Sequence, residues 1–254
     1  MFTAVLTWFQ SLFTEALESG REILGSRAIR TAIRWIWPYA GVIVGMDAAA
    51  HYGDATGAAL PVQLFISQDH SFGEFLEYSL TTACAVMLFR MWRDTRASAY
   101  LANAVLMVWL TLDNALEFHE QFGHWVAPYI PDPAGSPFAA NDIGEMLFFL
   151  AVGVTWLFGL TRSLFSAQKR PAVHSLYIAA GVAMTAFFGV VVDIFNTGPE
   201  TLLTKNIATW LEDGGEFAFI NLTFLMVVAF YDAHKRARAS KVEPQVAGLA
   251  LAAA

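Results

Sequence analysis

Apolar residues occur along this chain in six long runs that are separated by short polar segments. The runs cover about residues 32–52, 72–92, 98–119, 143–163, 174–195 and 209–231. Each run is long enough for a helix that crosses the hydrocarbon core of a bilayer, which needs about 20 residues. None shows the alternation of polar and apolar residues that marks the strands of a membrane β-barrel. The pattern therefore predicts an all-α, polytopic integral membrane protein with six transmembrane helices.

The segment before the first run has a different pattern. Phe2, Leu6, Phe9 and Phe13 recur near helical spacing and are followed by charged residues. This spacing is typical of an amphipathic helix that lies on a membrane surface. We therefore expect three parts: an amphipathic helix on the cytoplasmic side over 1–30, a six-helix transmembrane domain over 31–232, and a cytoplasmic tail over 233–254.

Composition supports a membrane protein and excludes several other classes. Of the 254 residues, 56% are hydrophobic and only 15% are charged, whereas soluble domains carry about 25% charged residues. The mean hydropathy is +0.48. The net charge of −7 provides no basic surface for nucleic acid, and the single cysteine, Cys84, cannot form an internal disulfide. The expected partner is the lipid bilayer, and nucleic acid is excluded.

The basic residues predict the orientation in the membrane. Fourteen of the 15 Lys and Arg residues lie before the first run, between the second and third, between the fourth and fifth, or after the sixth. Loops rich in Lys and Arg stay on the cytoplasmic side. We therefore expect a multi-pass protein of a bacterial inner (plasma) membrane with both termini in the cytoplasm. The other three connections then face the periplasm.

Acidic residues are concentrated at the opposite, outer end. The segments 47–77, 113–145 and 193–216 hold 16 Asp and Glu residues against one base, Lys205. Several of these acids fall inside the apolar runs, where ionisable groups are costly and commonly mark a functional site. The sequence therefore predicts an acidic cluster at the outer end of the helix bundle.

The even-numbered runs open with a repeated Gly-Glu pair. The three pairs, separated by 71 residues each time, are Gly73-Glu74, Gly144-Glu145 and Gly215-Glu216. Acids also stand near the ends of the odd-numbered runs. Internal repeats are common in membrane proteins, and their sites lie between the repeats. We therefore predict three helical hairpins that each contribute acids to one site.

Helical spacing groups these acids with histidines, because residues three and four apart share a helix face. We expect such stripes on five of the six runs: Asp47 with His51, His70 with Glu74 and Glu77, Asp113 with Glu117 and Glu120, Asn141 with Asp142 and Glu145, and Glu212 with Asp213 and Glu216. Asp193 stands on the remaining run. The candidate metal ligands are Asp47, His51, His70, Glu74, Glu77, Asp113, Glu117, Glu120, Glu145, Asp193, Glu212 and Glu216. Carboxylates with a few imidazoles on facing helices suit iron or manganese first, and copper or zinc second. His119 falls off its neighbours' stripe and should face another helix, whereas His174 and His234 receive no role.

A structural explanation competes for three of the glutamates. Ser71, Asp142 and Asp213 each precede a glutamate by three residues, which is the spacing of a helix capping box. Capping does not account for acids at the C-terminal ends of helices, where the helix dipole disfavours negative charge. Protons or bound cations must neutralise those acids.

These features predict a metal-binding membrane protein. Its expected function is that of a metalloenzyme, by non-haem di-iron or manganese redox chemistry or by metal-assisted hydrolysis, acting on a membrane or periplasmic small molecule. The alternatives are a cation- or proton-coupled transporter, and a non-catalytic subunit of a membrane complex or oligomer. The pattern assigns neither catalytic residues nor the substrate.

Overall fold

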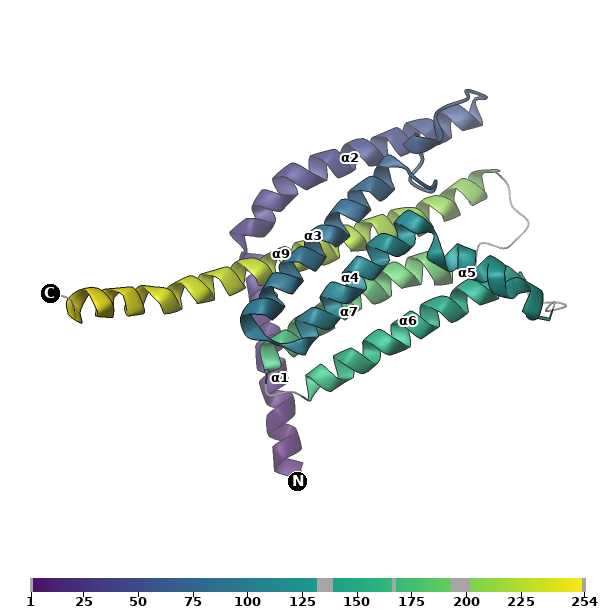
Figure 1. Cartoon of the computed structure of the whole chain (residues 1–254). Coiled ribbons are helices and arrows are strands. Elements are labelled where there is room, and N and C mark those ends of the chain that lie inside the picture. The colour runs from purple at the N-terminus through teal and green to yellow at the C-terminus, as the bar shows by residue number, and fades with distance from the viewer. Residues whose placement is uncertain (1, 132–138, 166–167, 193–201, 253–254) are drawn as a thin grey trace.

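The protein folds into a bundle of long helices. The computed structural model describes residues 2–131, 139–165, 168–192 and 202–252, and within these ranges it contains helices and turns but no strand. The long helices are α2 (Arg27–Ala55), α3 (Phe72–Thr95), α4 (Ser98–Leu116), α6 (Ala140–Leu164), α7 (Lys169–Ala186) and α9 (Leu202–Ala252). They run side by side, while α1 (Phe2–Gly25) leaves the bundle at a steep angle (Figure 1). The all-α prediction is confirmed.

Short elements lie between the long helices. They are η1 (Val62–Leu64), α5 (Phe118–Val126), η2 (Ala127–Tyr129) and the π-helical segment η3 (Phe187–Val192) that continues α7. In Figure 1, α5 lies at the end of the bundle opposite to α1. The connections at this end of the bundle are therefore partly helical.

Among the residues that the structure describes, four helical stretches are long and apolar enough to cross a membrane. They are Ser98–Leu116, Ala140–Ser163, Lys169–Gly189 and Trp210–Ser240. The predicted runs 32–52 and 72–92 also form helices, α2 and α3, but they are not among these four. Both carry arginines toward one end and acids toward the other, which lowers their hydropathy. A membrane-spanning helical bundle is supported, and the number of six spans stays a prediction.

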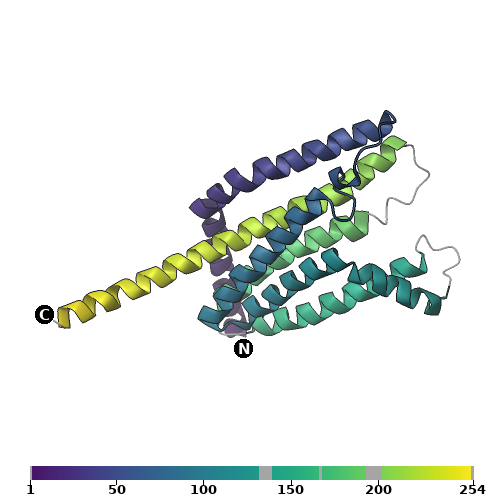
Figure 2. The same cartoon turned by 45° about the horizontal axis from the view of Figure 1, so that its top comes forward.

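The helices do not pair in three equivalent hairpins. α7 packs along α9, and α3 packs along α4 and against α9. α2, the partner of α3 in the predicted first hairpin, packs mainly on α9 (Figure 2). The buried core between these helices includes Leu88, Met107, Ile178 and Phe230. The threefold repeat is therefore not visible in the packing and stays a prediction.

Two helix ends differ from those predicted. The run over 98–119 breaks at Glu117, whose φ of 53° lies in the left-handed region that ends a helix. α9 is longer than its apolar run and continues through position 233, where the sequence analysis placed the start of the tail. Hydropathy reports which residues tolerate lipid and does not report where a helix stops, so charged turns extend α9 beyond the apolar part.

α1 carries an apolar stripe on its exposed side. Leu6, Phe9, Phe13 and Leu17 are exposed, whereas Ser19 is fully buried. The helix contacts α7 and α9 with its other side. This arrangement agrees with the amphipathic helix that the spacing predicted.

Candidate functional site: an apolar cavity with an acidic mouth

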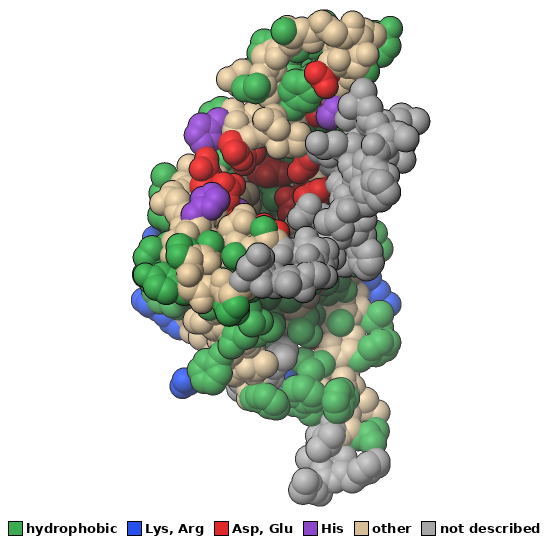
Figure 3. All heavy atoms as spheres, turned by 90° about the vertical axis from the view of Figure 1, so that its right-hand side faces the viewer, with side chains coloured by type: hydrophobic (Ala, Val, Ile, Leu, Met, Phe, Trp, Pro, Cys, Tyr) green, Lys and Arg blue, Asp and Glu red, His purple; other side chains and the backbone are tan. Residues whose placement is uncertain are grey.

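A cavity of about 780 Å³ lies inside the bundle between α3, α4, α6, α7 and α9. Most of its wall is apolar and includes Leu106, Met107, Phe149 and Trp156. Its charged and titratable lining residues, which we call the acidic mouth, are His119, Asp142, Glu145, Glu212 and Glu216. Figure 3 shows acidic side chains gathered around a hollow at this end of the molecule. The apolar cavity thus ends at the acidic mouth.

The start of α6 places two of these acids. α6 begins at Ala140, and the backbone N–H of Ala139 donates to the carboxylate of Asp142 at 2.8 Å. Negative charge is favoured in the first turn of a helix. Asp142 thus occupies the third position of the helix instead of the cap that the capping alternative assigned to it. Glu145 follows one turn later and interacts electrostatically with His119 and Glu120.

α9 places two further acids, one turn apart. Glu212 and Glu216 both line the cavity. Glu216 lies so close to Gly189 that a Cβ atom at position 189 would overlap its carboxylate. Because α9 begins at Leu202, Asp213 and Glu216 lie well inside a helix, and the capping alternative is wrong at this position.

Glu77 approaches the same mouth from α3. Its side chain is buried, with 7% of the residue exposed. It interacts electrostatically with Glu216, Glu74 and Asp213. Three helices, α3, α6 and α9, therefore bring acids toward one region. His119 on α5 also lines the mouth.

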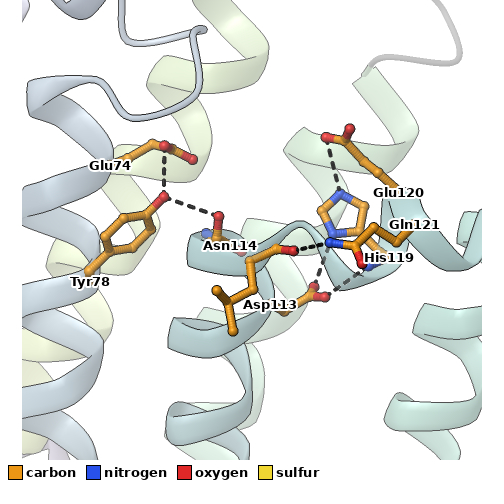
Figure 4. Close-up of polar contacts among 8 residues, drawn as sticks. Glu74, Tyr78, Asp113, Asn114, His119, Glu120 and Gln121 are labelled. Atoms are coloured by element: carbon orange, nitrogen blue, oxygen red, sulfur yellow. Dashed lines mark hydrogen bonds and ion pairs between the residues drawn. The ribbon is translucent and has the colours of Figure 1, made fainter.

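The start of α3 shows one half of the capping box predicted at Glu74, because Ser71 is the N-cap while the Glu74 carboxylate accepts from the N–H of His70 and not of Ser71. Ser71 accepts a hydrogen bond from the Glu74 N–H at 3.2 Å. The Tyr78 hydroxyl lies 2.7 Å from the Glu74 carboxylate and 3.0 Å from the carbonyl oxygen of Asn114 on α4 (Figure 4). Because α3 starts at Phe72, His70 lies outside the helix, and His70, Glu74 and Glu77 do not form one helical stripe. The predicted contact between His70 and Glu74 does form, because the His70 N–H donates to the Glu74 carboxylate and the His70 Nδ1 lies 4.0 Å from it.

The break after α4 rearranges another predicted stripe. Glu117 sits at the break, so Asp113, Glu117 and Glu120 do not share one helix face. His119 instead folds back on Asp113, with Nδ1 3.2 Å from a carboxylate oxygen (Figure 4). His119 also faces a neighbouring helix, as the sequence predicted, because its ring lies 4.9 Å from the ring of Phe149 on α6. Burial lowers the pKa of His119, but the hydrogen bond and charge of Asp113, with Glu145 and Glu120, outweigh it and raise the pKa above its ordinary value.

The pair on α2 stands apart from the cavity lining. His51 Nε2 lies 3.5 Å from Asp47, as the spacing predicted. Asp47 also accepts a hydrogen bond from the Ile66 N–H at 2.9 Å, which ties the loop after η1 to α2. Neither residue lines the cavity. Asp193, also a predicted ligand, lies outside the described residues.

A buried polar group that the sequence pattern did not predict lies on the side of the cavity away from the acidic mouth. His174 is 1% exposed, and its Nδ1 lies 2.8 Å from the Tyr100 hydroxyl. One turn along α4, Asn103 donates to Ser175 at 2.7 Å and accepts from Trp156 Nε1 at 3.3 Å. Trp156 lines the cavity. The sequence feature that could have indicated this group is the set of Arg170, His174 and Ser175 near the start of the otherwise apolar helix α7.

The described residues bring no three His, Cys, Asp or Glu side chains close enough to hold a metal ion. The prediction of iron or manganese, with copper or zinc second, therefore stays a prediction. The site places a row of carboxylates beside a largely apolar chamber.

Comparison with known proteins gives one match. No curated protein and no solved structure matches this chain. A family model with the description "Domain of unknown function (DUF8692)" matches residues 38–230. That range contains most of α2, all of the helices that line the cavity up to Phe230 of α9, and the acidic mouth. Because the match covers most of the chain, the protein belongs to the DUF8692 family.

Proposed function

We propose that this protein binds a cationic amphiphile, a small molecule with a positive group and an apolar body. The observation that carries the proposal is the cavity, whose apolar walls end at the acidic mouth. The positive group lies among the carboxylates and the apolar body fills the chamber. In this proposal the bundle crosses a bacterial inner membrane six times, with both termini in the cytoplasm and the mouth facing outward.

The charge of the mouth favours a cation. Four carboxylates line it, and among the described lining residues there is no Lys or Arg. His119 is engaged by Asp113 and supplies at most one positive charge. Carboxylates gathered beside an apolar wall repel one another strongly, because the local dielectric constant is low. A bound cation relieves this repulsion.

The apolar wall favours an amphiphile over a bare ion. The cavity is within the size range of sites for small organic ligands, about 300–1,000 Å³. Met107, Phe149 and Trp156 offer contact surface for hydrocarbon or aromatic groups. A hydrated inorganic ion gains nothing from these walls.

Binding of tetraphenylphosphonium to the detergent-purified protein tests the proposal. The isosteric anion tetraphenylborate is the control for hydrophobic partition alone. We expect saturable binding of the cation, and about tenfold weaker binding after Glu216→Gln, since tenfold corresponds to one lost charge contact of about 1.4 kcal/mol. Asp54→Asn, which removes an exposed acid that does not line the cavity, should leave binding unchanged.

Two outcomes of this experiment overturn the proposal. Equal binding of the anion would mean that the ligands partition into detergent or into an unselective apolar surface. Stoichiometric iron, manganese, copper or zinc in the purified protein, lost in Glu216→Gln, would instead support the metal-binding function.

Proton-coupled transport is a second candidate, and a specific observation favours it. The hydrogen bonds from Trp156 through Asn103 to Ser175 extend polar groups from the cavity floor toward the start of α7. Next to Ser175, the ring of His174 lies 3.9 Å from Glu22 of α1. A carrier needs polar groups on both sides of its binding site, and these residues supply the side away from the mouth.

Vesicles that contain the purified protein test the transport candidate. We expect a pH gradient to drive uptake of tetraphenylphosphonium, and Asn103→Leu to abolish uptake while the detergent-purified variant still binds the cation. Retained binding shows that the variant is folded. Uptake that is unchanged in this variant would contradict the transport candidate and leave a binding protein.

A further inference from the structure

A second cleft lies at the opposite end of the bundle, between the last turns of α3 and the part of α9 that follows Tyr231. Its volume is about 800 Å³. It is lined by Arg90, Arg93, Asp94, Tyr231, His234, Lys235, Arg238 and Ala239. Four Lys or Arg side chains thus face one acid, the reverse of the charge at the acidic mouth.

Tyr231 brings two of these cations together. Arg90 Nη1 lies 3.4 Å from the Tyr231 hydroxyl. Lys235 Nζ lies 5.9 Å from the centre of the Tyr231 ring, within the range of a cation–π contact. Two like charges from different helices are held on one aromatic side chain. Such an arrangement prepares a site for an anion.

Asp94 holds two further basic groups, Arg238 and His234, and leaves the cleft positive. Its Oδ2 atom lies 2.6 Å from Arg238 Nη1 and 3.1 Å from His234 Nε2. These contacts lower the pKa of Asp94 below its ordinary value. One carboxylate thereby fixes the position of Arg238, while Arg90, Arg93 and Lys235 make no ion pair among the described residues.

The surface beside the cleft is apolar. Val86 and Phe89, which stand on α3 just before Arg90, are 46% and 48% exposed. In a membrane-spanning bundle such side chains face acyl chains. The cleft therefore lies where the apolar surface of α3 gives way to charge, at the depth of lipid headgroups. Basic pockets between helices on the cytoplasmic side are a common form of headgroup site.

We propose that this cleft binds phosphate, presented by the headgroup of an anionic phospholipid at the cytoplasmic surface. Arg90, Arg93 and Lys235 contact the phosphate, and Arg238, positioned by Asp94, closes the site. The acyl chains lie along Val86 and Phe89. This inference is independent of the function proposed for the acidic mouth.

Native mass spectrometry of the detergent-purified protein tests this proposal. Phosphatidylglycerol and phosphatidylcholine are titrated separately, because both carry phosphate but only the first has a net negative charge. We expect tighter binding of phosphatidylglycerol. Each Lys or Arg near an anionic headgroup contributes about 1 kcal/mol, so Arg90→Gln/Lys235→Gln should weaken phosphatidylglycerol binding by about 30-fold.

The control variant is Arg162→Gln/Arg236→Gln, which removes two exposed cations that do not line the cleft. Arg236 lies next to Lys235 on α9 and pairs with Asp232. If the site is specific, the control keeps phosphatidylglycerol binding. Equal weakening in both double variants, or equal binding of the two lipids by the native protein, would overturn the proposal.

A separate titration with glycerol 1-phosphate distinguishes a lipid headgroup from a soluble phosphate. A shift in melting temperature that is lost in Arg90→Gln/Lys235→Gln, without selectivity for phosphatidylglycerol, would overturn the lipid source. Selective lipid binding without a shift by glycerol 1-phosphate would support the headgroup together with its acyl chains as the ligand.

Discussion

Asp113 binds His119 with both of its carboxylate oxygens. One oxygen accepts the backbone N–H of His119 at 3.1 Å, and the other lies 3.2 Å from Nδ1 of the same residue. Asp113 is fully buried at the C-terminal end of α4, where the helix dipole disfavours a negative charge. A protonated His119 compensates for this charge. The pair therefore joins α4 to α5 across the break at Glu117.

This relationship predicts that Asp113→Ala destabilises the protein. The substitution leaves a half-buried imidazole and a backbone N–H without their acceptor, and losses of this kind cost about 2–4 kcal/mol. Thermal unfolding in detergent should show a clearly lower melting temperature. Asp54→Ala, at an exposed position near the end of α2, is the control and should melt like the native protein. Equal melting of both variants would contradict the role of Asp113.

The raised pKa of His119 predicts a pH dependence of stability. A group whose pKa is higher in the folded state than in the unfolded state stabilises the fold when it is protonated. For His119 this stabilisation is complete below the unfolded pKa of about 6.5. It is lost as the pH rises through the pKa of the folded state. The acidic groups that interact with His119 are Asp113, Glu120, Glu145 and, from α9, Glu216. The difference in melting temperature between the native protein and His119→Gln should therefore be larger at pH 5.5 than at pH 9.

His124→Gln is the control for this pH series, because His124 is an exposed histidine on the same short helix. We expect its melting temperature to follow that of the native protein at every pH. A difference for His119→Gln that is constant, or that grows toward high pH, would show that protonated His119 does not stabilise the fold.

The fold class was predictable from hydropathy, but the site was predictable only in part. Long apolar runs specify helices, and carboxylates near their ends place acids at one end of the bundle. Glu145, Glu212 and Glu216 do line the cavity. The stripe through Asp113, Glu117 and Glu120 failed because it assumed an unbroken helix. Nothing in local spacing reports the left-handed backbone at Glu117.

Hydrogen bonds between helices far apart in the sequence were also beyond local reasoning. His174 meets Tyr100 across 74 positions of sequence, and Tyr177 donates to the Ala16 carbonyl across 161. Such contacts depend on how helices pack, which periodicity along one helix does not encode. The glycines of the predicted repeat illustrate the same limit, because each has different neighbours. Gly73 faces Ile66, Gly144 faces Gly123, and Gly215 faces Phe188.

The contact between Gly123 and Gly144 predicts a strong effect of Gly144→Ala. A Cβ at position 144 would lie 2.8 Å from the Gly123 Cα and 3.1 Å from its carbonyl oxygen. Helices α5 and α6 would have to separate, and overpacking of this kind costs about 1–3 kcal/mol. Gly153→Ala in the same helix has no atom within 4 Å of the new Cβ and should stabilise α6 by up to about 1 kcal/mol. Opposite shifts of the two melting temperatures are the expected result.

Ion pairs of Arg170 hold α1 on the bundle. It stands at the start of α7 and forms ion pairs with Glu15 and Glu22 of α1, and its Nε atom lies 3.5 Å from Glu15. Burial raises the pKa of Glu15, although Arg170 opposes this shift. Without Arg170, two half-buried carboxylates of α1 lose their counter-charge, and breaking a buried pair from one side is more costly than losing an exposed one.

Arg170→Gln should therefore release α1 while the rest of the bundle stays folded. Hydrogen exchange with mass spectrometry should show faster exchange over residues 6–25 and unchanged exchange in α3 and α4. Arg162→Gln, an exposed arginine near the end of α6, is the matched control. Because Tyr177 also donates to the Ala16 carbonyl at 3.0 Å, Arg170→Gln/Tyr177→Phe should accelerate exchange in α1 further. Unchanged exchange of α1 in the double variant would mean that its apolar contacts with α7 and α9 suffice to hold it.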